Sequence, residues 1–196
     1  SVGGRSGTAE RGLGWELVGF FRDVKDLIDI VTGPGGIDTL ENVAGTTKVR
    51  GGELILSGRI SAGLSANASV TVTDAKPAGS SLQQQETPRT LAKLALDYAP
   101  RDGALFAGMT VLHTGDVYRR AAGARLNYGN YYVVDLNAGV RLGSDRRHRL
   151  SVRLENALDE KYASRVRTGE TDAGDAYAFS FRGSPRTLHA SYAYEF

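Results

Sequence analysis

The sequence contains no cysteine, so disulfide bonds and thiol chemistry are both excluded. It also lacks any run of about 18 apolar residues, which excludes a membrane-spanning helix. No signal peptide is recognisable, and because the chain starts at Ser1 we expect a mature form or a piece of a longer protein. A protein that crosses a bilayer with strands stays possible, since such strands alternate apolar and polar residues and keep a low mean hydropathy.

A large excess of charge of one sign is missing as well. The 24 Lys and Arg residues stand against 22 Asp and Glu residues, and no zinc-finger or RNA-binding pattern occurs. A nucleic-acid partner is therefore not expected. The three histidines, His113, His148 and His189, are far apart and lack the spacing of metal ligands. We predict neither a metal site nor a cofactor.

Enzyme signatures are also absent. The sequence has no phosphate-binding loop of the Gly-x-x-x-x-Gly-Lys-Ser/Thr type and no Gly-x-Ser-x-Gly nucleophile elbow. Glu155 and Asp159 resemble a pair of carboxylates, as in outer-membrane hydrolases, but no nucleophile lies near them in the sequence. We predict no catalytic residues and a protein that is not an enzyme.

What the sequence does have is alternation of apolar and polar residues. The C-terminal segment shows it to its last residue, with Leu188, Tyr192 and Phe196 among the apolar side chains. A period of two predicts a strand with one apolar and one polar face. About eight segments share the pattern at roughly ten residues each, the length that a tilted strand needs to cross a bilayer. These segments are 15–30, 46–58, 64–73, 92–98, 105–113, 132–142, 149–155 and 188–196.

The two faces carry different expectations. The apolar side chains that alternate most regularly are expected to face lipid. They are Val70, Val72, Val134, Leu136, Val152 and Leu154. The polar side chains are expected to line the lumen of a barrel. They are Glu53, Lys93, Asp97, Asp135, Arg141, Arg149 and Arg153.

The connections between these segments alternate in length. Short turns are predicted at 58–61, 100–103 and 143–147, and long polar loops at 30–45, 75–88, 115–129 and 159–182. Ser1–Gly14 is also interpreted as a loop, and a short amphipathic helix is an alternative for residues 23–31. Short turns on one side and long loops on the other are typical of outer-membrane barrels. The pattern favours an all-β, antiparallel transmembrane barrel over a soluble sandwich or a lipocalin-like barrel.

Several motifs resemble one known family. The strongest are Arg153–Tyr162 and Pro185-Arg186-Thr187, which leads to the terminal Phe196. The others are Phe20–Ile28, Glu41-Asn42-Val43 followed by Gly51–Leu54, and Thr87-Pro88-Arg89. In order and spacing the motifs resemble the C-terminal part of the barrel of a TonB-dependent outer-membrane receptor. Gly52 is a minor departure, since the family usually has a larger residue there.

This resemblance implies that residues 1–196 are about eight C-terminal strands of a 22-stranded barrel, forming an arc of its wall. Such receptors also carry an N-terminal plug domain and a short TonB box that TonB grips, neither of which is recognisable here. The implied function is import of a scarce nutrient, in the first place a ferric siderophore and otherwise cobalamin, energised by TonB through the plug region. The alternative is a self-contained eight-stranded outer-membrane barrel that acts as an adhesin or small channel.

The same resemblance implies a location and partners. The location is the outer membrane of a Gram-negative bacterium, with the C-terminus towards the periplasm. The partners are membrane lipid, lipopolysaccharide and the barrel-assembly machinery, which would contact the strand ending in Phe196. The motif from Asn156 to Tyr162 is expected to be structural, with a bend at Asn156 and Asp159 and Tyr162 at the membrane interface.

Cations in the predicted outer loops are the candidate ligand contacts. An anionic ferric chelate would be steered and bound by opposite charge. The candidates are Arg119, Arg120, Arg125, Arg165 and Arg167. Plain solvated charge and contact with anionic lipopolysaccharide are the two alternatives for these residues.

Overall fold

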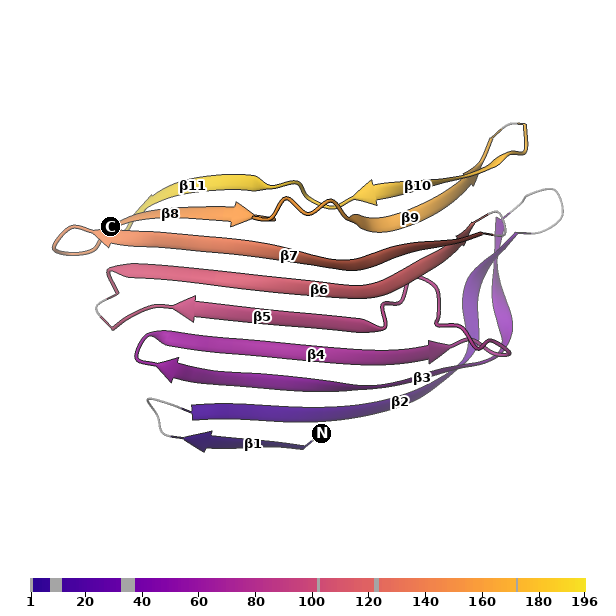
Figure 1. The fold of residues 1–196 in the computed structure, drawn as a ribbon, viewed down its shortest axis with the longest axis horizontal. Helices are drawn as coiled ribbons and strands as arrows, with labels where there is room; N and C mark the ends of the chain where they lie inside the picture. Colours follow the sequence, from indigo (N-terminus) through magenta and orange to yellow (C-terminus); the bar gives the residue numbers. More distant parts are fainter. Residues whose placement is uncertain (1, 8–11, 33–37, 102, 122–123, 172) are drawn as a thin grey trace.

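The computed structural model of the chain describes residues 2–7, 12–32, 38–101, 103–121, 124–171 and 173–196. Nine strands form one sheet in the order β1-β2-β3-β4-β5-β6-β7-β8-β11, and β9 and β10 form a second sheet of two strands (Figure 1). All pairs are antiparallel. The strands are β1 (Val2–Gly7), β2 (Gly12–Thr32), β3 (Asp38–Ser61), β4 (Leu64–Lys76), β5 (Thr90–Tyr98), β6 (Leu105–Ala121), β7 (Ala124–Leu142), β8 (His148–Glu155), β9 (Ala163–Glu170), β10 (Ala176–Arg182) and β11 (Thr187–Tyr194).

The eight alternating segments of the sequence correspond to β2–β8 and β11. The main sheet has a ninth strand, β1, so the interpretation of Ser1–Gly14 as a loop is wrong for residues 2–7 and 12–14. The helix considered for residues 23–31 is also wrong, because β2 continues to Thr32. A bulge explains the misleading spacing: Asp26 has a φ of 53° and the register shifts between Lys25 and Leu27. The extra residue lies in β3, where Ala44 and Gly45 together oppose Asp26, and the left-handed backbone of Asp26 interrupts the regular alternation of β2.

Two of the three short turns are confirmed, and the first is misplaced. The first lies at 62–63 instead of 58–61, because Ser61 still pairs with Leu64, and Gly63 turns the chain at a φ of 95°. The other two connect β5 to β6 and β7 to β8. In Figure 1 these connections lie at one end of the sheet, together with the C-terminus. A hydrogen bond from Glu195 N to Arg147 O, 3.0 Å long, holds the C-terminus against the last turn.

Three of the four long loops are wrong, because most of their residues belong to strands. β2 and β3 stay paired up to Thr32 and Asp38, and β6 and β7 up to Ala121 and Ala124. Residues 159–182 contain β9 and β10. Glycine, polar and charged residues are frequent in these segments, so they resembled loops, although Tyr177, Phe179 and Phe181 alternate along β10. The loop predicted at 75–88 is confirmed, and it occupies residues 77–89.

Alternation sorts the side chains of the main sheet as predicted. One row of cross-strand partners is apolar: Leu96, Met109, Leu136, Leu154 and Leu188. The next row, on the opposite face, is mostly polar: Asp97, Gly108, Asn137, Arg153 and His189. The six residues expected to face lipid all lie on the apolar face, where Leu136 is 38% exposed and Val152 48%. A broad exposed apolar face of this kind indicates contact with a membrane or another protein. Contact with lipid stays a prediction.

Aromatic side chains bound this apolar face along β7. At the short-turn end His148 contacts Tyr192 and Tyr194, with ring centroids 6.0 and 5.0 Å apart. Towards the other end His113 stacks on Tyr132 at 4.3 Å. About ten residues of β7 separate the two groups, the length of a strand that crosses a bilayer. We call the sheet between these groups the wall. The part beyond Tyr132, with the 77–89 loop, β9 and β10, is the rim.

The described sheet is open. β1 and β11 lie at opposite ends of the strand order, and no pairing joins them in the residues that the structure describes. The chain therefore forms an arc of wall, as the sequence predicts, rather than a closed eight-stranded barrel. Among the described residues no helix is long and apolar enough to cross a membrane.

Candidate functional site

The 77–89 loop replaces a missing piece of strand at the rim. β5 begins only at Thr90, whereas its neighbours β4 and β6 reach Lys76 and Ala121, so the sheet would otherwise have a gap here. The loop bridges the gap with backbone hydrogen bonds on both sides. Gln84 N donates to Ala75 O at 2.7 Å, and Glu86 N donates to Tyr118 O at 3.0 Å. These bonds make the loop a fixed part of the rim.

Side chains strengthen the same bridge. The Gln83 amide imitates a peptide group: its Nε2 donates to Thr73 O and its Oε1 accepts from Ala75 N, both at 3.0 Å. On the other side, the Tyr118 hydroxyl donates to Gln83 O. Ala75 and Tyr118 are buried, 3% and 6% exposed. Buried residues thus surround this loop, and their packing fixes the positions of the charged side chains next to the loop.

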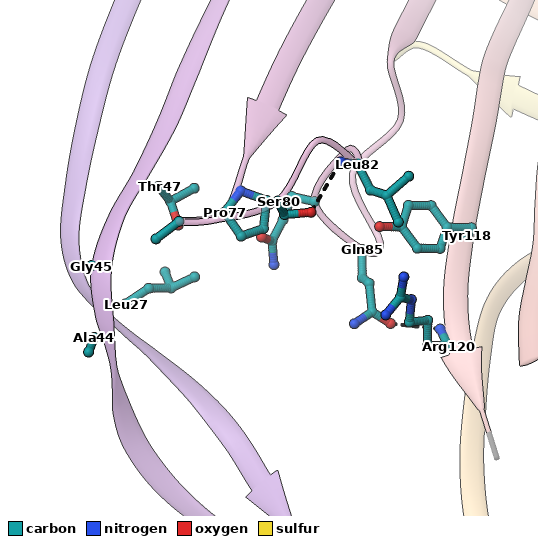
Figure 2. Close-up of a pocket in the computed structure, with 12 residues that line it drawn as sticks. Leu27, Ala44, Gly45, Thr47, Pro77, Ser80, Leu82, Gln85, Tyr118 and Arg120 are labelled. Atoms are coloured by element: carbon teal, nitrogen blue, oxygen red, sulfur yellow. Dashed lines mark hydrogen bonds between the residues drawn. The ribbon is translucent and has the colours of Figure 1, made fainter. Parts of the chain in front are cut away.

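A cavity of about 230 Å³ separates the 77–89 loop from β2 and β3. Figure 2 shows Leu82 beside the Tyr118 ring and Gln85 beside Arg120, with Leu27 on the opposite side. Arg120 N donates to Gln85 Oε1 at 2.7 Å. The cavity is therefore lined by apolar groups, by hydroxyl and amide side chains that include Gln84 and Gln85, and by the guanidinium of Arg120.

Glu86 joins three segments that are distant in the sequence. Its Oε1 accepts a hydrogen bond from Arg119 Nη1 of β6 at 3.0 Å and another from Arg167 Nη1 of β9 at 2.9 Å. The side chains of Glu86, Arg119 and Arg167 are 31%, 23% and 29% exposed. Partial burial limits screening by salt, and hydrogen bonds between ionised groups are stronger than neutral ones. This cluster connects the β9–β10 hairpin to the rest of the rim.

Tyr128 of β7 lies beside this cluster. Burial of its hydroxyl raises the pKa of Tyr128, and the Glu86 carboxylate raises it further. Arg119 and Arg165 act on the same hydroxyl in the opposite direction. The tyrosine therefore stays neutral at physiological pH and is able to donate a hydrogen bond.

The five predicted arginines do not form one group. Arg119 and Arg167 meet at Glu86, and Arg165 is close enough to act on Tyr128. Arg120 lines the cavity instead. Arg125 stacks over the Tyr118 ring, with Cζ 4.2 Å from the ring centroid, and its Nε donates to Asn127 Oδ1 at 2.9 Å.

Sequence reasoning missed Glu86 and Tyr128. Glu86 contacts a side chain 81 positions away, and nothing in the local pattern around it marks that contact. The only signal in the sequence is that Glu86 is an acidic residue in a predicted long loop, and many other residues share this property.

The motif around Asn156 is structural. Asn156 is 1% exposed and adopts a φ of 47° where β8 ends. Its Nδ2 donates to Glu160 O at 3.0 Å and to Ser184 O at 2.9 Å, and its Oδ1 accepts from Glu160 N at 2.9 Å. Its backbone N donates to Asp135 Oδ1 at 2.9 Å. One side chain thus connects the end of β8, the following turn and the segment that enters β11.

Glu155 and Asp159 do not form a carboxylate pair with a shared task. Glu155 Oε1 forms an ion pair with Arg153 Nη2 at 3.0 Å, and its Oε2 lies 3.7 Å from His189 Nε2. Asp159 accepts from Lys161 at 2.8 Å. Within the described residues, no group of three or more His, Cys, Asp or Glu side chains is placed to hold a metal ion.

Replacing Gln83 by Met should destabilise the rim by about 1–3 kcal/mol, because the buried Ala75 N–H and the Thr73 C=O lose their partner. Gln84→Met is the matched control: Gln84 Oε1 is buried without a hydrogen-bond partner in the described residues, so its removal should be neutral or stabilising. Hydrogen exchange of residues 73–90 in the intact protein measures both. Equal protection in the two variants would contradict the role of Gln83.

An open, antiparallel, two-faced wall with aromatic groups near both edges defines the class of protein: a piece of an outer-membrane β-barrel. Residues 2–157 match the model of the family described as TonB dependent receptor-like, beta-barrel. The chain belongs to this family, whose members are transport receptors of the outer membrane. No curated protein matches the sequence.

Solved structures share the fold at low sequence identity. The ferric yersiniabactin uptake receptor FyuA from Yersinia pestis has a TM-score of 0.74 and 23% identity, over 98% of this chain and 28% of its own. FpvA from Pseudomonas aeruginosa, solved with bound pyoverdine, has a TM-score of 0.71 and 18% identity, over 95% and 28%. The copper transporter OprC has a TM-score of 0.69 and 18% identity, over 99% and 31%. The chain thus spans about a quarter to a third of the structures it resembles.

Proposed function

We propose that the chain forms part of the barrel of an outer-membrane receptor that binds a scarce nutrient and imports it with energy from TonB. The observation that carries the proposal is the family match over residues 2–157 of a wall with one apolar and one polar face. The barrel wall separates the lipid from the lumen, and the rim beyond it offers cations and a cavity for a ligand. The TonB contact belongs to a plug region outside residues 1–196.

The proposed ligand is a ferric siderophore. Two observations support it. The matched structures include the siderophore receptor PiuA and the ferric yersiniabactin uptake receptor FyuA. At the rim Arg119 and Arg167 meet at Glu86, and Arg165 acts on the neighbouring Tyr128 hydroxyl. Ferric siderophores of the catecholate and carboxylate types are anionic, so such cations would attract them. Cobalamin is the second candidate. OprC, which shares the fold, is a copper transporter by name, so copper belongs among the ligands to be tested.

The orientation follows from the sorting of the connections. The short turns and the C-terminus lie at one end of the sheet and the rim at the other. Outer-membrane barrels have short periplasmic turns and longer extracellular loops. We therefore propose that the C-terminus is periplasmic and that the rim is extracellular beside lipopolysaccharide. We also propose that β11 and the exposed Phe196 that follows it are the contact for the barrel-assembly machinery.

Uptake by cells is the direct test. Cells that lack their own receptors and express the intact protein should accumulate iron from at least one of a panel of ferric siderophores, and a proton uncoupler should abolish the accumulation. Cobalamin and copper serve as alternative ligands in the same assay. No energy-dependent uptake of any of them, with the protein folded in the outer membrane, would contradict the proposed function.

The arginine pair should control affinity. In the intact protein, Arg119→Gln together with Arg167→Gln should weaken binding of the anionic ligand at least about tenfold, because two charge-assisted hydrogen bonds are lost. The dependence of the dissociation constant on salt should flatten as well. A second double variant, Arg120→Gln with Arg165→Gln, measures how much these two arginines contribute to binding. Arg147→Gln, at the opposite end of the sheet, is the control. Unchanged affinity and salt dependence would place recognition elsewhere.

A further inference from the structure

We propose that Arg119 and Arg167 form a binding site for a multiply charged oxyanion and that the chain's own Glu86 occupies this site when the ligand is absent. This inference rests on the proposed function and deepens it, because it names the chemistry that the site selects and the group that competes for it. Glu86 then acts as a built-in competitor that a ligand must displace.

The hydrogen-bonding capacity of the two arginines exceeds what Glu86 uses. Both Nη1 atoms donate to the same atom, Glu86 Oε1. Each guanidinium carries five N–H donors. Arg119 Nε is buried and has no partner in the part of the chain that the structure describes. An unpaired buried donor is unfavourable, so a ligand with several acceptor oxygens would satisfy groups that one carboxylate leaves unsatisfied.

The local charge favours a ligand with more negative charge than a carboxylate. Arg165 and Arg119 both act on the Tyr128 hydroxyl, so Arg165 belongs to the same neighbourhood as the pair on Glu86. Two guanidinium groups thus bind the Glu86 carboxylate, and a third, that of Arg165, acts on the neighbouring Tyr128 hydroxyl. A diphosphate or a ferric complex with several ionised oxygens would neutralise this cluster more completely than Glu86 does. The Tyr128 hydroxyl adds a neutral donor at the side of the site.

Glu86 is placed so that its side chain is able to leave. It belongs to the 77–89 loop. The hydrogen bond that joins Glu86 to β6 runs from the backbone N of Glu86 to Tyr118 O and does not involve the side chain. The side chain is therefore free to rotate away from the arginines without breaking that bond. The backbone of Glu86 has a φ of 58°, a conformation that non-glycine residues adopt only at a cost in energy. The loop thus keeps Glu86 in a backbone conformation that the residue does not prefer by itself.

A tethered competitor gives the site a threshold. A group held on a short loop acts at an effective concentration in the millimolar range, so a weak free ligand does not displace it. A monoanion offers the arginines nothing that Glu86 lacks. A multiply charged oxyanion does, and the site therefore discriminates by charge. The shared chemistry occurs in a soluble anionic chelate and in the phosphates of lipopolysaccharide, and the experiment separates these two sources.

The test uses the intact protein, purified in detergent and free of lipopolysaccharide, with inorganic pyrophosphate as the soluble probe in calorimetric titrations. Glu86→Gln should tighten pyrophosphate binding roughly tenfold, the equivalent of about 1.4 kcal/mol. Glu86→Ala removes the acceptor completely and should tighten binding at least as much. Adding Arg119→Gln and Arg167→Gln to Glu86→Gln should abolish the gain. A second titration replaces pyrophosphate by micelles that contain lipid A.

Asp145→Asn is the matched control, because Asp145 pairs with Arg147 at 3.3 Å in the turn at the opposite end of the sheet. It changes the net charge equally and should leave both titrations unchanged. The mobility shift of the folded barrel on heating in gels confirms that every variant folds. A gain with lipid A alone still supports the site and assigns its anion to the lipid.

Two results would overturn the inference. The first is that Glu86→Gln binds pyrophosphate no more tightly than the unmodified protein does, and lipid A no more tightly either. The second is that the gain in affinity persists when both arginines are replaced. Neither result bears on uptake, which is measured separately with ferric siderophores. Uptake without a Glu86 effect would leave the proposed function standing, whereas a Glu86 effect without uptake would leave an anion site in a protein of another function.

Discussion

Arginine at Leu136 should destabilise the folded protein in a bilayer by about 2–4 kcal/mol, because a charged side chain at the middle of the lipid face loses its hydration. Leu136 lies midway along the part of β7 between the two aromatic groups, and its cross-strand partners are Met109 and Leu154. It is 38% exposed in the isolated arc, so the cost comes from lipid contact and not from overpacking of a core.

The control is Asn67→Arg on the opposite face. The cross-strand partners of Asn67 are Ser57 and Ala95, so an arginine introduced at position 67 would not lie directly opposite another arginine on either neighbouring strand. If that face lines a wet lumen, arginine there should cost far less. Urea unfolding of the intact protein in phospholipid vesicles gives both free energies. Equal tolerance at the two positions would contradict a transmembrane wall.

The second large effect is expected at Asn156. Asn156→Ala should cost about 3–5 kcal/mol, because Glu160 N, Glu160 O and Ser184 O all lose their partner and alanine is disfavoured at a φ of 47°. The same unfolding experiment measures this loss.

Two further variants at this position separate the causes. Asn156→Asp keeps the shape but places an oxygen opposite two carbonyl groups, so it should be nearly as damaging as alanine. Asn156→Gly removes the backbone cost and should recover only that part. Asn137→Ala, at an exposed asparagine of β7, should stay within about 0.5 kcal/mol. A loss of that size at Asn156 as well would show that the turn does not depend on the side chain.

The wall was predictable because its signal is local. A strand with lipid or core on one side and water on the other must alternate, and eight of the nine strands of the main sheet do so clearly enough to be found. The rim was not predictable in the same way. Beyond Tyr132, β6 and β7 stay paired although neither face is uniformly apolar, so residues 115–129 resembled a loop. β2 misled for another reason, since the left-handed backbone of Asp26, opposite a bulge in β3, interrupts its alternation.

The candidate site was predictable only as a residue type. Five arginines in polar segments were the natural candidates for contact with an anion, yet only Arg119 and Arg167 share a partner. That partner, Glu86, lies on a loop that fills the space above a short β5. Its position depends on the lengths of β4, β5 and β6 together, which no local pattern specifies.

The sequence by itself determined the two faces of the wall, two of the three short turns, the bend at Asn156 and the resemblance to a family, because each depends on residues that are neighbours along the chain. Tertiary structure alone decided which polar segments continue as strands, how the 77–89 loop completes the sheet, and which arginines meet Glu86. The physical reason is that hydrophobic period acts over a few residues. A charged cluster forms only where the register of several strands brings distant side chains to the same place.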